Sequence, residues 1–332
     1  MDKGIHNMIN EELWLGKPYY SLDAYCKNTF HEKLYKIAID AGMTCPNRDG
    51  TLDTRGCVFC SAGGSGDYSV EYDIDNPKPL KDQIKEGFSL LRNKNTGYHF
   101  IAYFQSFSNT YAPLSYLNKI FTSALDDPNI AGISIATRPD CISEGVLSLL
   151  SRLRTDYPDK FVWIELGLQT IHDSTAKYIR RGYDLSVFNT IVQKLTAVRI
   201  PVIVHLILGL PGETDEMILQ SVEYLNSLPV WGIKLQLLHV LKKTELAEHY
   251  ARGEFETLTK EHYMNLLLSC LSRLSPRIVI HRLTGDGPKD SLIAPLWSTN
   301  KRDVLNTLHK ECKQKSVWQG KYYHDTGTID SL

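Results

Sequence analysis

The sequence predicts an α/β protein whose strands form a parallel sheet. Six short, strongly apolar segments recur along the chain, and amphipathic stretches separate them. Strands covered by helices on both faces are nearly continuous apolar runs, as most of these are. Six strand–helix units in succession imply parallel strands joined by right-handed crossovers. A length of 332 residues is normal for a single α/β barrel.

The expected elements alternate over most of the chain. We expect strands at 33–40, 98–105, 130–137, 161–169, 200–208 and 231–240. Between them, the stretches 114–125, 143–154 and 186–198 place apolar residues near helical spacing. We expect an N-terminal extension over 1–32, a core barrel over 33–285 and a C-terminal extension over 286–332. No linker is long enough to separate independent domains.

The composition indicates a globular protein of the reducing cytoplasm. The chain is 42% hydrophobic and 23% charged, and its net charge is -1. This balance gives no global attraction to nucleic acid or anionic membrane, although a local basic patch is compatible with it. The N-terminus has no apolar region typical of a secretory signal, and the most apolar run, 200–212, is too short for a membrane span. Seven cysteines, an odd number, argue against a disulfide framework.

Three of the seven cysteines lie close together after the first expected strand. Eleven residues separate Cys45 from Cys57, and two separate Cys57 from Cys60. The loop that carries them follows the carboxyl end of the strand, where α/β barrels keep their chemistry. Several turn-forming residues lie between the cysteines, so the loop is able to fold the thiolates inward. The cluster therefore predicts a metal site.

Several interpretations compete for this site. A structural zinc site normally has four ligands, and the nearest histidine, His31, precedes the strand. A ferredoxin-type cluster brings a fourth, closely spaced cysteine, and a redox Cys-x-x-Cys pair leaves Cys45 unused. Buried cysteines without a ligand fit poorly in a loop rich in Gly and Asp. An iron–sulfur cluster in which one iron has no protein ligand uses three thiolates and fits best.

The cysteine loop resembles that of the radical S-adenosylmethionine (SAM) enzymes. Its long first gap, with CPNRDG at the start and GCVFC at the end, is similar to the MnmL (YtqA/YhcC-type) subgroup, relatives of the catalytic subunit of Elongator. The resemblance covers roughly residues 18–310 and implies a partial (β/α)6 TIM-type barrel with short extensions. It also implies that Cys45, Cys57 and Cys60 hold three irons of a [4Fe-4S] cluster, while the amino and carboxylate groups of SAM chelate the fourth.

The resemblance also assigns residues to SAM. Gly63 and Gly64 are similar to the glycine pair whose backbone meets the methionine amino group, a close approach that a Cβ would hinder. Gln169, at the end of the fourth expected strand, and Arg181, one helix later, resemble residues that bind the SAM carboxylate or ribose. An arginine suits a carboxylate because its fork donates two parallel hydrogen bonds.

Other polar residues fall at the ends of expected strands. Thr137, Arg138 and Asp140, at the end of the third strand, are candidates for the lining of the active site. Ala136, beside them, stands where Elongator-type relatives usually carry a glutamate. His205 is expected to be a core histidine rather than a ligand, and Thr214 the N-cap of the next helix. Candidates for meeting a charged substrate or closing the barrel mouth are His239, Lys242, Lys243, Arg282, Asp286 and Lys301.

The resemblance implies a radical reaction on RNA. A flavodoxin- or ferredoxin-like donor supplies an electron, SAM is cleaved to methionine and a 5′-deoxyadenosyl radical, and the radical abstracts a hydrogen atom from the substrate. The implied substrate is tRNA, whose wobble 5-carboxymethylaminomethyl-(2-thio)uridine is converted to the 5-aminomethyl form that a downstream methyltransferase can use. The basic, aromatic segment from Lys310 to Tyr323 is compatible with RNA contacts.

The remaining cysteines narrow the chemistry. Cys26, Cys141, Cys270 and Cys312 are scattered and form no second cluster, which disfavours methylthiotransferases and sulfur-inserting enzymes. Two alternatives stay open. One is a radical SAM enzyme that acts on a small metabolite, and the other is a non-catalytic iron–sulfur protein that binds RNA or senses iron. No membrane partner is expected.

Overall fold

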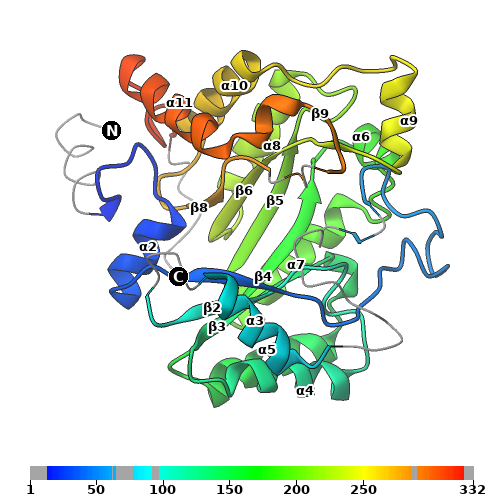
Figure 1. The fold of residues 1–332 in the computed structure, drawn as a ribbon, viewed down its shortest axis with the longest axis vertical. Coiled ribbons are helices and arrows are strands. Elements are labelled where there is room, and N and C mark those ends of the chain that lie inside the picture. Colours follow the sequence, from blue (N-terminus) through cyan, green and yellow to red (C-terminus); the bar gives the residue numbers. More distant parts are fainter. Residues whose placement is uncertain are drawn as a thin grey trace. The chain divides into compact units, whose positions relative to one another are not determined.

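The computed structural model describes residues 13–61, 63–64, 78–91, 97–285, 287 and 290–324 (Figure 1). The chain divides into two compact units. The cysteine unit comprises Phe30–Gly167 and Gly182–Val202. The terminal unit comprises Met1–Thr29, Leu168–Arg181 and Ile203–Leu332, so it contains both chain ends.

The cysteine unit is built on parallel strands in the order β1-β2-β3-β4. Their bounds are Tyr35–Ile39 for β1, Phe100–Phe104 for β2, Ile130–Thr137 for β3 and Phe161–Gln169 for β4, whose last two residues belong to the terminal unit. Its helices are α3 (Leu80–Leu91), α4 (Leu114–Leu125), α5 (Glu144–Asp156) and α7 (Leu185–Ala197), with a short 3-10 turn, η2, at Pro139–Cys141.

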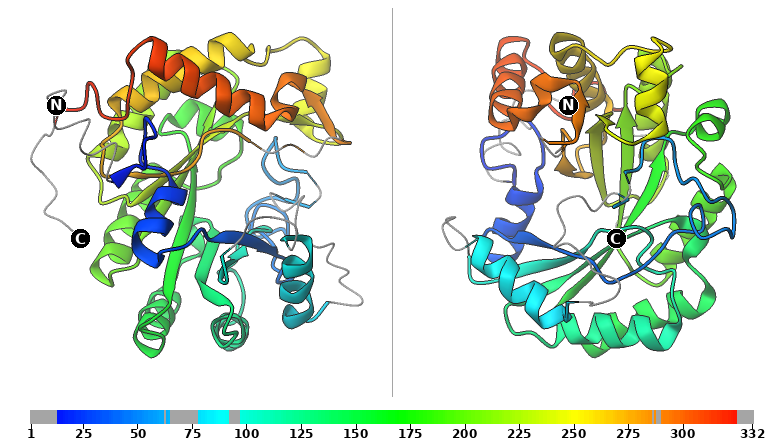
Figure 2. Two further views of the ribbon diagram at one scale, coloured as in Figure 1. Left: turned by 60° about the vertical axis from the view of Figure 1, so that its left-hand side comes forward. Right: turned by 45° about the vertical axis from the view of Figure 1, so that its right-hand side comes forward.

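Helices α3 and α4 cover one face of this sheet (Figure 2). The Phe104 ring of β2 packs edge-on against Phe121 of α4, with centroids 5.1 Å apart. Gly87 of α3 lies so close to Ile37 of β1 that an added Cβ would come within 2.3 Å of that side chain. Phe104 and Ile37 therefore point toward the helices. Because side chains alternate along a strand, the residues next to them in sequence point to the opposite face, which we call the inner face.

The terminal unit contains three parallel strands in the order β5-β6-β8 and a small antiparallel pair. The parallel strands are β5 (Val202–Leu208), β6 (Gly232–Leu237) and β8 (Val279–Arg282), and the pair is β7 (Val240–Leu241) with β9 (Leu292–Ala294). Its helical elements are α2 (Leu22–Phe30, ending one residue into the cysteine unit), α6 (Asp173–Tyr178), α8 (Asp215–Asn226), α9 (Glu245–Ala251), α10 (Lys260–Arg273), η3 (Leu296–Thr299) and α11 (Lys301–Gln314). Helix α10 packs against both α8 and α11, and Figure 2 shows α10 and α11 side by side.

A buried glutamine ties the two ends of the described chain together. The side chain of Gln319 is inaccessible to solvent and accepts a 2.9 Å hydrogen bond from the Tyr20 backbone N–H. Its amide donates to the carbonyls of Ser275 and Ile278 at 2.7 and 2.8 Å. The Ile280 N–H, at β8, donates in turn to the Tyr20 carbonyl at 2.7 Å. The terminal unit therefore depends on residues from opposite ends of the sequence.

The six expected strands are confirmed, each with ends within three residues of the expected ones. The expected N-cap is also confirmed, because the Thr214 hydroxyl accepts a 3.3 Å hydrogen bond from the Met217 N–H at the start of α8. Strand β8 was not expected. Within the described ranges, no helix combines the length and apolar character that a membrane span requires.

Candidate functional site

The loop after β1 brings the three predicted cysteines together. Cys45, Cys57 and Cys60 are each partly buried, so their sulfurs remain within reach of a ligand. The neighbouring Cys57 thiol and burial raise the pKa of Cys60, and Cys45 adds to this shift. A thiolate beside other thiolates is disfavoured by repulsion, so the shift reflects sulfurs gathered in a small space. A bound cation or cluster would reverse this balance and keep them ionised.

Short-range hydrogen bonds shape the loop. The Arg48 N–H donates to the Cys45 carbonyl at 2.8 Å, and the Gly56 N–H donates to the Asn47 carbonyl at 2.7 Å. Gly56 has a positive φ of 77°, and an added Cβ would lie 2.8 Å from the Arg48 Nε. Both facts favour glycine at this position. The turn that it closes leads directly into the Cys-x-x-Cys segment.

Two arginines place positive charge beside the sulfurs. The Arg48 guanidinium donates to the carbonyls of Cys60 and Ser61, at 3.1 and 2.5 Å, and its charge favours the Cys60 thiolate. Arg138 is close enough to Cys45 for their charges to interact. Cationic neighbours stabilise thiolates, which are the form that binds metal. The loop therefore suits an anionic metal–thiolate group.

Arg138 is itself held rigidly. Its guanidinium donates two hydrogen bonds to Asp140, at 2.9 and 2.7 Å, and lies 5.1 Å from the centroid of the Tyr183 ring. Gly182 has a φ of 82°, and a Cβ there would lie 3.2 Å from the arginine and 2.8 Å from the Asn47 Oδ1. The sequence predicts Arg138 and Asp140 as lining of the active site, but it does not predict that the charge of Arg138 interacts with Cys45.

The predicted glycine pair follows the third cysteine in a tight turn. The Gly64 N–H donates to the Ser61 carbonyl at 3.0 Å, and the Ser61 hydroxyl donates to the Gly64 carbonyl at 3.1 Å. Gly63 is exposed, whereas Gly64 is buried with a φ of 67°. A Cβ on Gly64 would lie 3.0 Å from the Phe107 ring. The backbone at this pair is thus held close to the cysteine loop.

The other two predicted SAM residues lie in the terminal unit, around the turn after β4. Gln169 ends this strand with a φ of 63° and is partly buried. Arg181 is only 2% exposed, and its guanidinium donates to the carbonyls of Leu168 and Thr170 at 3.3 and 2.7 Å. Arg181 therefore fixes the backbone that carries Gln169. This structural role was not foreseen from the sequence.

The remaining candidates divide between strands and surface loops. His205, Lys234 and Arg282 occupy neighbouring register positions on β5, β6 and β8. Lys242 donates to the Asp290 carbonyl at 2.7 Å, and Lys301 begins α11 in an exposed position. Asp286 lies outside the described residues. Of the candidates that the structure describes, His205 and Arg282 lie on parallel strands, and Lys234, between them, was not among the residues singled out from the sequence.

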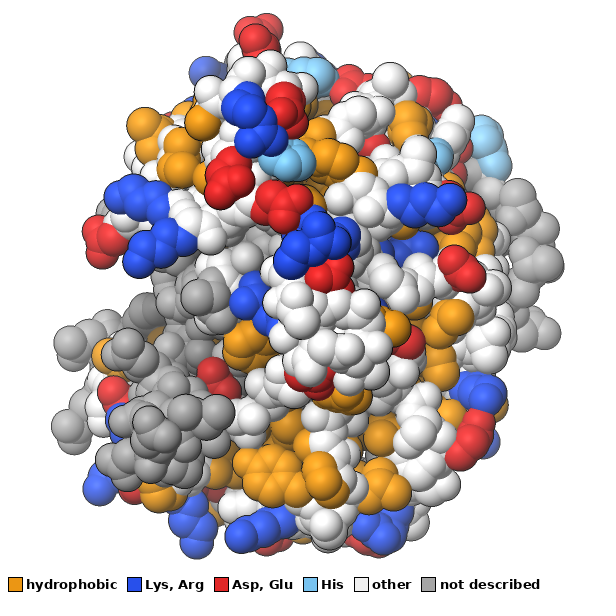
Figure 3. All heavy atoms as spheres, turned by 90° about the vertical axis from the view of Figure 1, so that its right-hand side faces the viewer, with side chains coloured by type: hydrophobic (Ala, Val, Ile, Leu, Met, Phe, Trp, Pro, Cys, Tyr) orange, Lys and Arg blue, Asp and Glu red, His pale blue; other side chains and the backbone are white. Residues whose placement is uncertain are grey.

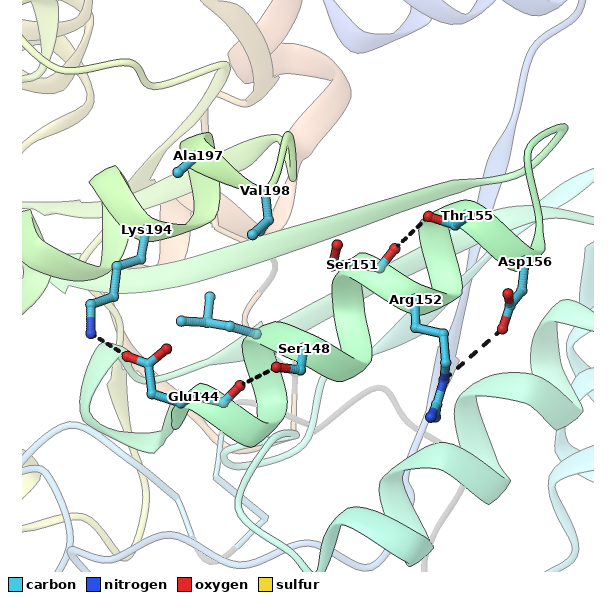
Figure 4. A pocket seen from close by; sticks show the side chains of 10 residues that line it. Glu144, Ser148, Ser151, Arg152, Thr155, Asp156, Lys194, Ala197 and Val198 are labelled. Atoms are coloured by element: carbon cyan, nitrogen blue, oxygen red, sulfur yellow. Dashed lines mark hydrogen bonds and ion pairs between the residues drawn. The ribbon is translucent and has the colours of Figure 1, made fainter.

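A groove on the helical side of the cysteine unit holds none of the predicted site residues. It runs between α5 and α7, and Figure 4 shows Lys194 of α7 reaching across it to Glu144 of α5. Along α5, Arg152 lies 4.0 Å from Asp156. The charged residues of its lining are paired with one another, and the others are apolar or carry hydroxyl groups, so we assign it no chemistry.

The donor set distinguishes between the possible metal centres. Among the residues that the structure describes, no three His, Cys, Asp or Glu side chains converge on a point that would hold a single metal ion. A four-iron cluster takes each cysteine on a separate iron, and a mononuclear zinc site normally takes four ligands around one ion. The loop after β1 supplies three cysteines. None of the seven cysteines, all of which are described, is in a disulfide.

Three cysteines in the loop after a parallel strand are the arrangement expected of an α/β iron–sulfur protein. Family models agree: the Radical SAM superfamily model matches residues 54–225, and the Radical_SAM C-terminal domain model matches residues 230–314. The chain belongs to the radical SAM superfamily.

Individual relatives support the assignment. The protein YtqA of Bacillus subtilis is 39% identical over 92% of this chain and 93% of its own length. The tRNA uridine(34) acetyltransferase of Methanocaldococcus infernus is 25% identical, over 52% of this chain and 32% of that protein. The structure of the archaeal Methanocaldococcus infernus Elp3 with an N-terminal deletion superposes with a TM-score of 0.64 at 17% identity, covering 86% of this chain and 64% of that chain.

The family and fold settle the class of protein. The expected partial barrel of the radical SAM type is confirmed by the likeness to the Elp3 structure. The protein is a radical SAM enzyme, and the cofactors of this family are a [4Fe-4S] cluster and SAM. When bound, they supply a 5′-deoxyadenosyl radical for hydrogen abstraction, and the protein orients the reacting groups.

Proposed function

We propose that the cysteine loop holds the iron–sulfur cluster and that two turns hold SAM. The grouping of three partly buried thiols beside two arginines is the observation that supports the cluster site. The tight turn after Cys60 offers the backbone groups of Gly63 and Gly64 to SAM. The turn after β4 offers the side chain of Gln169, whose backbone Arg181 holds in place. The proposed ligands are Cys45, Cys57 and Cys60 for iron, and Gly63, Gly64, Gln169 and Arg181 for SAM.

We propose further that the substrate is tRNA. The reaction is the conversion of wobble 5-carboxymethylaminomethyl-(2-thio)uridine to the 5-aminomethyl form. The likeness to a tRNA uridine(34) acetyltransferase and to Elp3 supports an RNA substrate, and the single cysteine cluster supports a reaction without sulfur insertion. The electron comes from a flavodoxin- or ferredoxin-like protein, and a methyltransferase can consume the product, both in a reducing cytoplasm.

Helix α11 supplies a surface suited to RNA. Arg302, Lys310 and Lys313 are exposed, fall near one side of the helix, and form no ion pair with the described residues. Lys315 differs, because it pairs with Glu311 at 2.9 Å. Figure 3 shows the usual mixture of basic and acidic groups on another face of the molecule. An unpaired basic ridge suits phosphates, because their binding releases counterions.

The backbone of the C-terminal aromatic segment is bonded to α10, although the Tyr322 side chain remains exposed. The Gly320 N–H donates to the Leu271 carbonyl at 3.0 Å, and the Tyr322 N–H donates to the Ser272 carbonyl at 2.7 Å. Lys321 stacks over Trp318, 5.3 Å from its ring centroid. Truncation before Lys310 would destroy this packing, so point substitutions on α11 test RNA binding better.

Mass spectrometry of tRNA nucleosides tests the reaction. Cells that lack the gene should retain the 5-carboxymethylaminomethyl form and lose the 5-aminomethyl and methylaminomethyl forms. The wild-type gene should restore the normal profile, and a gene with Cys45→Ala should not. An unchanged profile in a host without a redundant pathway would count against tRNA and favour a small metabolite.

RNA binding provides a separate test. A triple Gln variant at Arg302, Lys310 and Lys313 should bind tRNA more weakly and lower the salt dependence of log Kd by about two to three. Lys194→Gln, at the α5–α7 groove, is the matched control and should leave the affinity unchanged. An unaltered salt dependence in the triple variant would remove α11 from the RNA surface.

A further inference from the structure

An ion pair lies on the inner face of the cysteine unit's sheet, where neither the cysteine loop nor the SAM turns use it. The Lys36 Nζ of β1 lies 2.5 Å from the Glu165 Oε1 of β4. The Ser134 hydroxyl of β3 donates to the same oxygen at 2.6 Å. The Tyr103 ring of β2 lies under the ammonium, 4.4 Å away. Four neighbouring strands thus contribute one residue each.

The pair is costly to bury. The side chain of Glu165 is 0% exposed, whereas that of Lys36 is 19% exposed. A buried carboxylate requires donors, and Ser134 and Lys36 provide two. Apolar residues of similar volume often stabilise a core as well as a buried ion pair does, so such a pair is weak evidence of a role in stability. The pair instead fixes an ammonium group at a defined place.

Lys36 retains the capacity to bind a ligand. An ammonium group has three donors, and Lys36 gives one to Glu165. Two positions farther toward the carboxyl ends of β1, β3 and β4, the same face carries Ala38, Ala136 and Gly167. Gln105 takes the corresponding place just after β2, and the Tyr183 hydroxyl donates to the Gly167 carbonyl. Three of the four strands thus place only small side chains between the ammonium and the strand ends, where the cysteine loop begins. The strand ends are the side from which an anionic group would approach Lys36.

We propose that Lys36 binds a carboxylate of the substrate and thereby determines specificity. Glu165 and Ser134 act as positioning residues, because Glu165 holds the ammonium and Ser134 holds the Glu165 carboxylate. The identity of the carboxylate rests on the proposed function: it is the carboxylate of the 5-carboxymethylaminomethyl group. The product lacks this group, so the same lysine favours substrate over product.

The test compares the affinities of three anticodon stem-loops for the holoenzyme. Their wobble uridine carries a 5-carboxymethylaminomethyl group, a 5-aminomethyl group or no substituent. The wild type should bind the carboxylate-bearing stem-loop tighter than the unmodified one by on the order of 10- to 100-fold, as expected for a charged hydrogen bond. Lys36→Met should abolish this preference and leave the affinity for the unmodified stem-loop unchanged.

Two further variants keep the test interpretable. Lys36→Met leaves Glu165 buried without its cation, so the double variant K36M/E165Q, which removes both charges, is measured beside it. Lys33→Met is the matched control, because the Lys33 Nζ also lies over a tyrosine ring, 4.5 Å from the centroid of the Tyr35 ring. The control should keep the preference for the carboxylate, and the double variant should lose it.

The outcomes separate this proposal from the proposed function. An equal loss of affinity for all three stem-loops in both Lys36 variants would show a merely structural role and overturn the proposal. No preference in the wild type, or an unchanged preference in K36M/E165Q, would also overturn it. Turnover is measured in parallel: a carboxylate preference that depends on Lys36, without conversion to the aminomethyl form, would support Lys36 and contradict the proposed reaction.

Discussion

Each cysteine of the loop is expected to be essential at the residue level. Anaerobic reconstitution of the wild type should give about four irons per chain, the content of one cluster. Replacing Cys45, Cys57 or Cys60 with Ala should remove the cluster absorbance and abolish SAM cleavage. Full iron content in the triple variant would disprove the assignment.

The buried cysteines supply matched controls for that experiment. Burial raises the pKa of Cys270 and Cys312 to about 12, so both are protonated thiols near neutral pH. Cys270→Ala and Cys312→Ala should therefore retain the iron and its absorbance. A loss of iron in either variant without a loss of folded protein would indicate a second binding site.

Arg181 has a structural role that must be separated from SAM binding. Its hydrogen bonds to the Leu168 and Thr170 carbonyls predict that Arg181→Ala unfolds more easily, by about 1–3 kcal/mol, in the absence of SAM. Chemical denaturation measures this loss. Isothermal titration then measures SAM affinity in the folded variant, which should fall if the guanidinium also contacts SAM. Normal SAM affinity in a variant of reduced stability would show that Arg181 has a structural role and does not bind SAM.

Residues adjacent in sequence were easier to predict than residues that meet only in space. The cysteine spacing predicts a metal site, and the structure groups the three thiols in the loop after β1. The approach of Arg138 to Cys45 depends on the path of the chain after β3, which no local pattern encodes. Lys36 and Glu165 are 129 positions apart, and each by itself is an ordinary charged residue in a strand. Their pairing follows from the register of four strands.

At the level of elements, apolar runs located the longer strands. The sequence pattern did not predict strand β8, because this strand spans only Val279–Arg282 and half of its residues are polar. A short run that ends in His281 and Arg282 lacks the continuous apolar character on which the prediction relied. The strand is held instead by its pairing with β6 and by the hydrogen bond that the Ile280 N–H donates to the Tyr20 carbonyl.

Helix α8 offers a test of an individual cap. Thr214→Ala removes the side chain that accepts from the Met217 N–H, and should lower the free energy of unfolding by about 1 kcal/mol. Thr214→Ser keeps the hydroxyl and should restore most of it. Urea unfolding at constant m-value checks both variants. Equal stability of the Ala variant and the wild type would show that this cap contributes nothing.

At the level of the whole molecule, Glu213 predicts a component of the pH dependence of stability. Burial raises the pKa of Glu213 above its ordinary 4.5, although a hydrogen bond from Thr170 opposes the shift. The folded state therefore binds this proton more tightly than the unfolded state. Its contribution to stability is greatest below pH 4.5 and falls as pH rises through the folded-state pKa.

Glu213→Gln isolates that component. The variant cannot ionise, so its unfolding free energy should decline less steeply than that of the wild type between about pH 4.5 and neutrality. Thermal or urea unfolding over this pH range measures the difference. Parallel curves for the two proteins would show that Glu213 has the same pKa in both states.

The division of the chain between the two units has a consequence for synthesis on the ribosome. Every residue of the cysteine unit has been translated once Val202 is reached. The terminal unit must wait for Gln319, because this side chain joins Tyr20 to the residues before β8. Translation is slow compared with the folding of small domains, so the cysteine loop can fold while Tyr20 still lacks its hydrogen bond to Gln319.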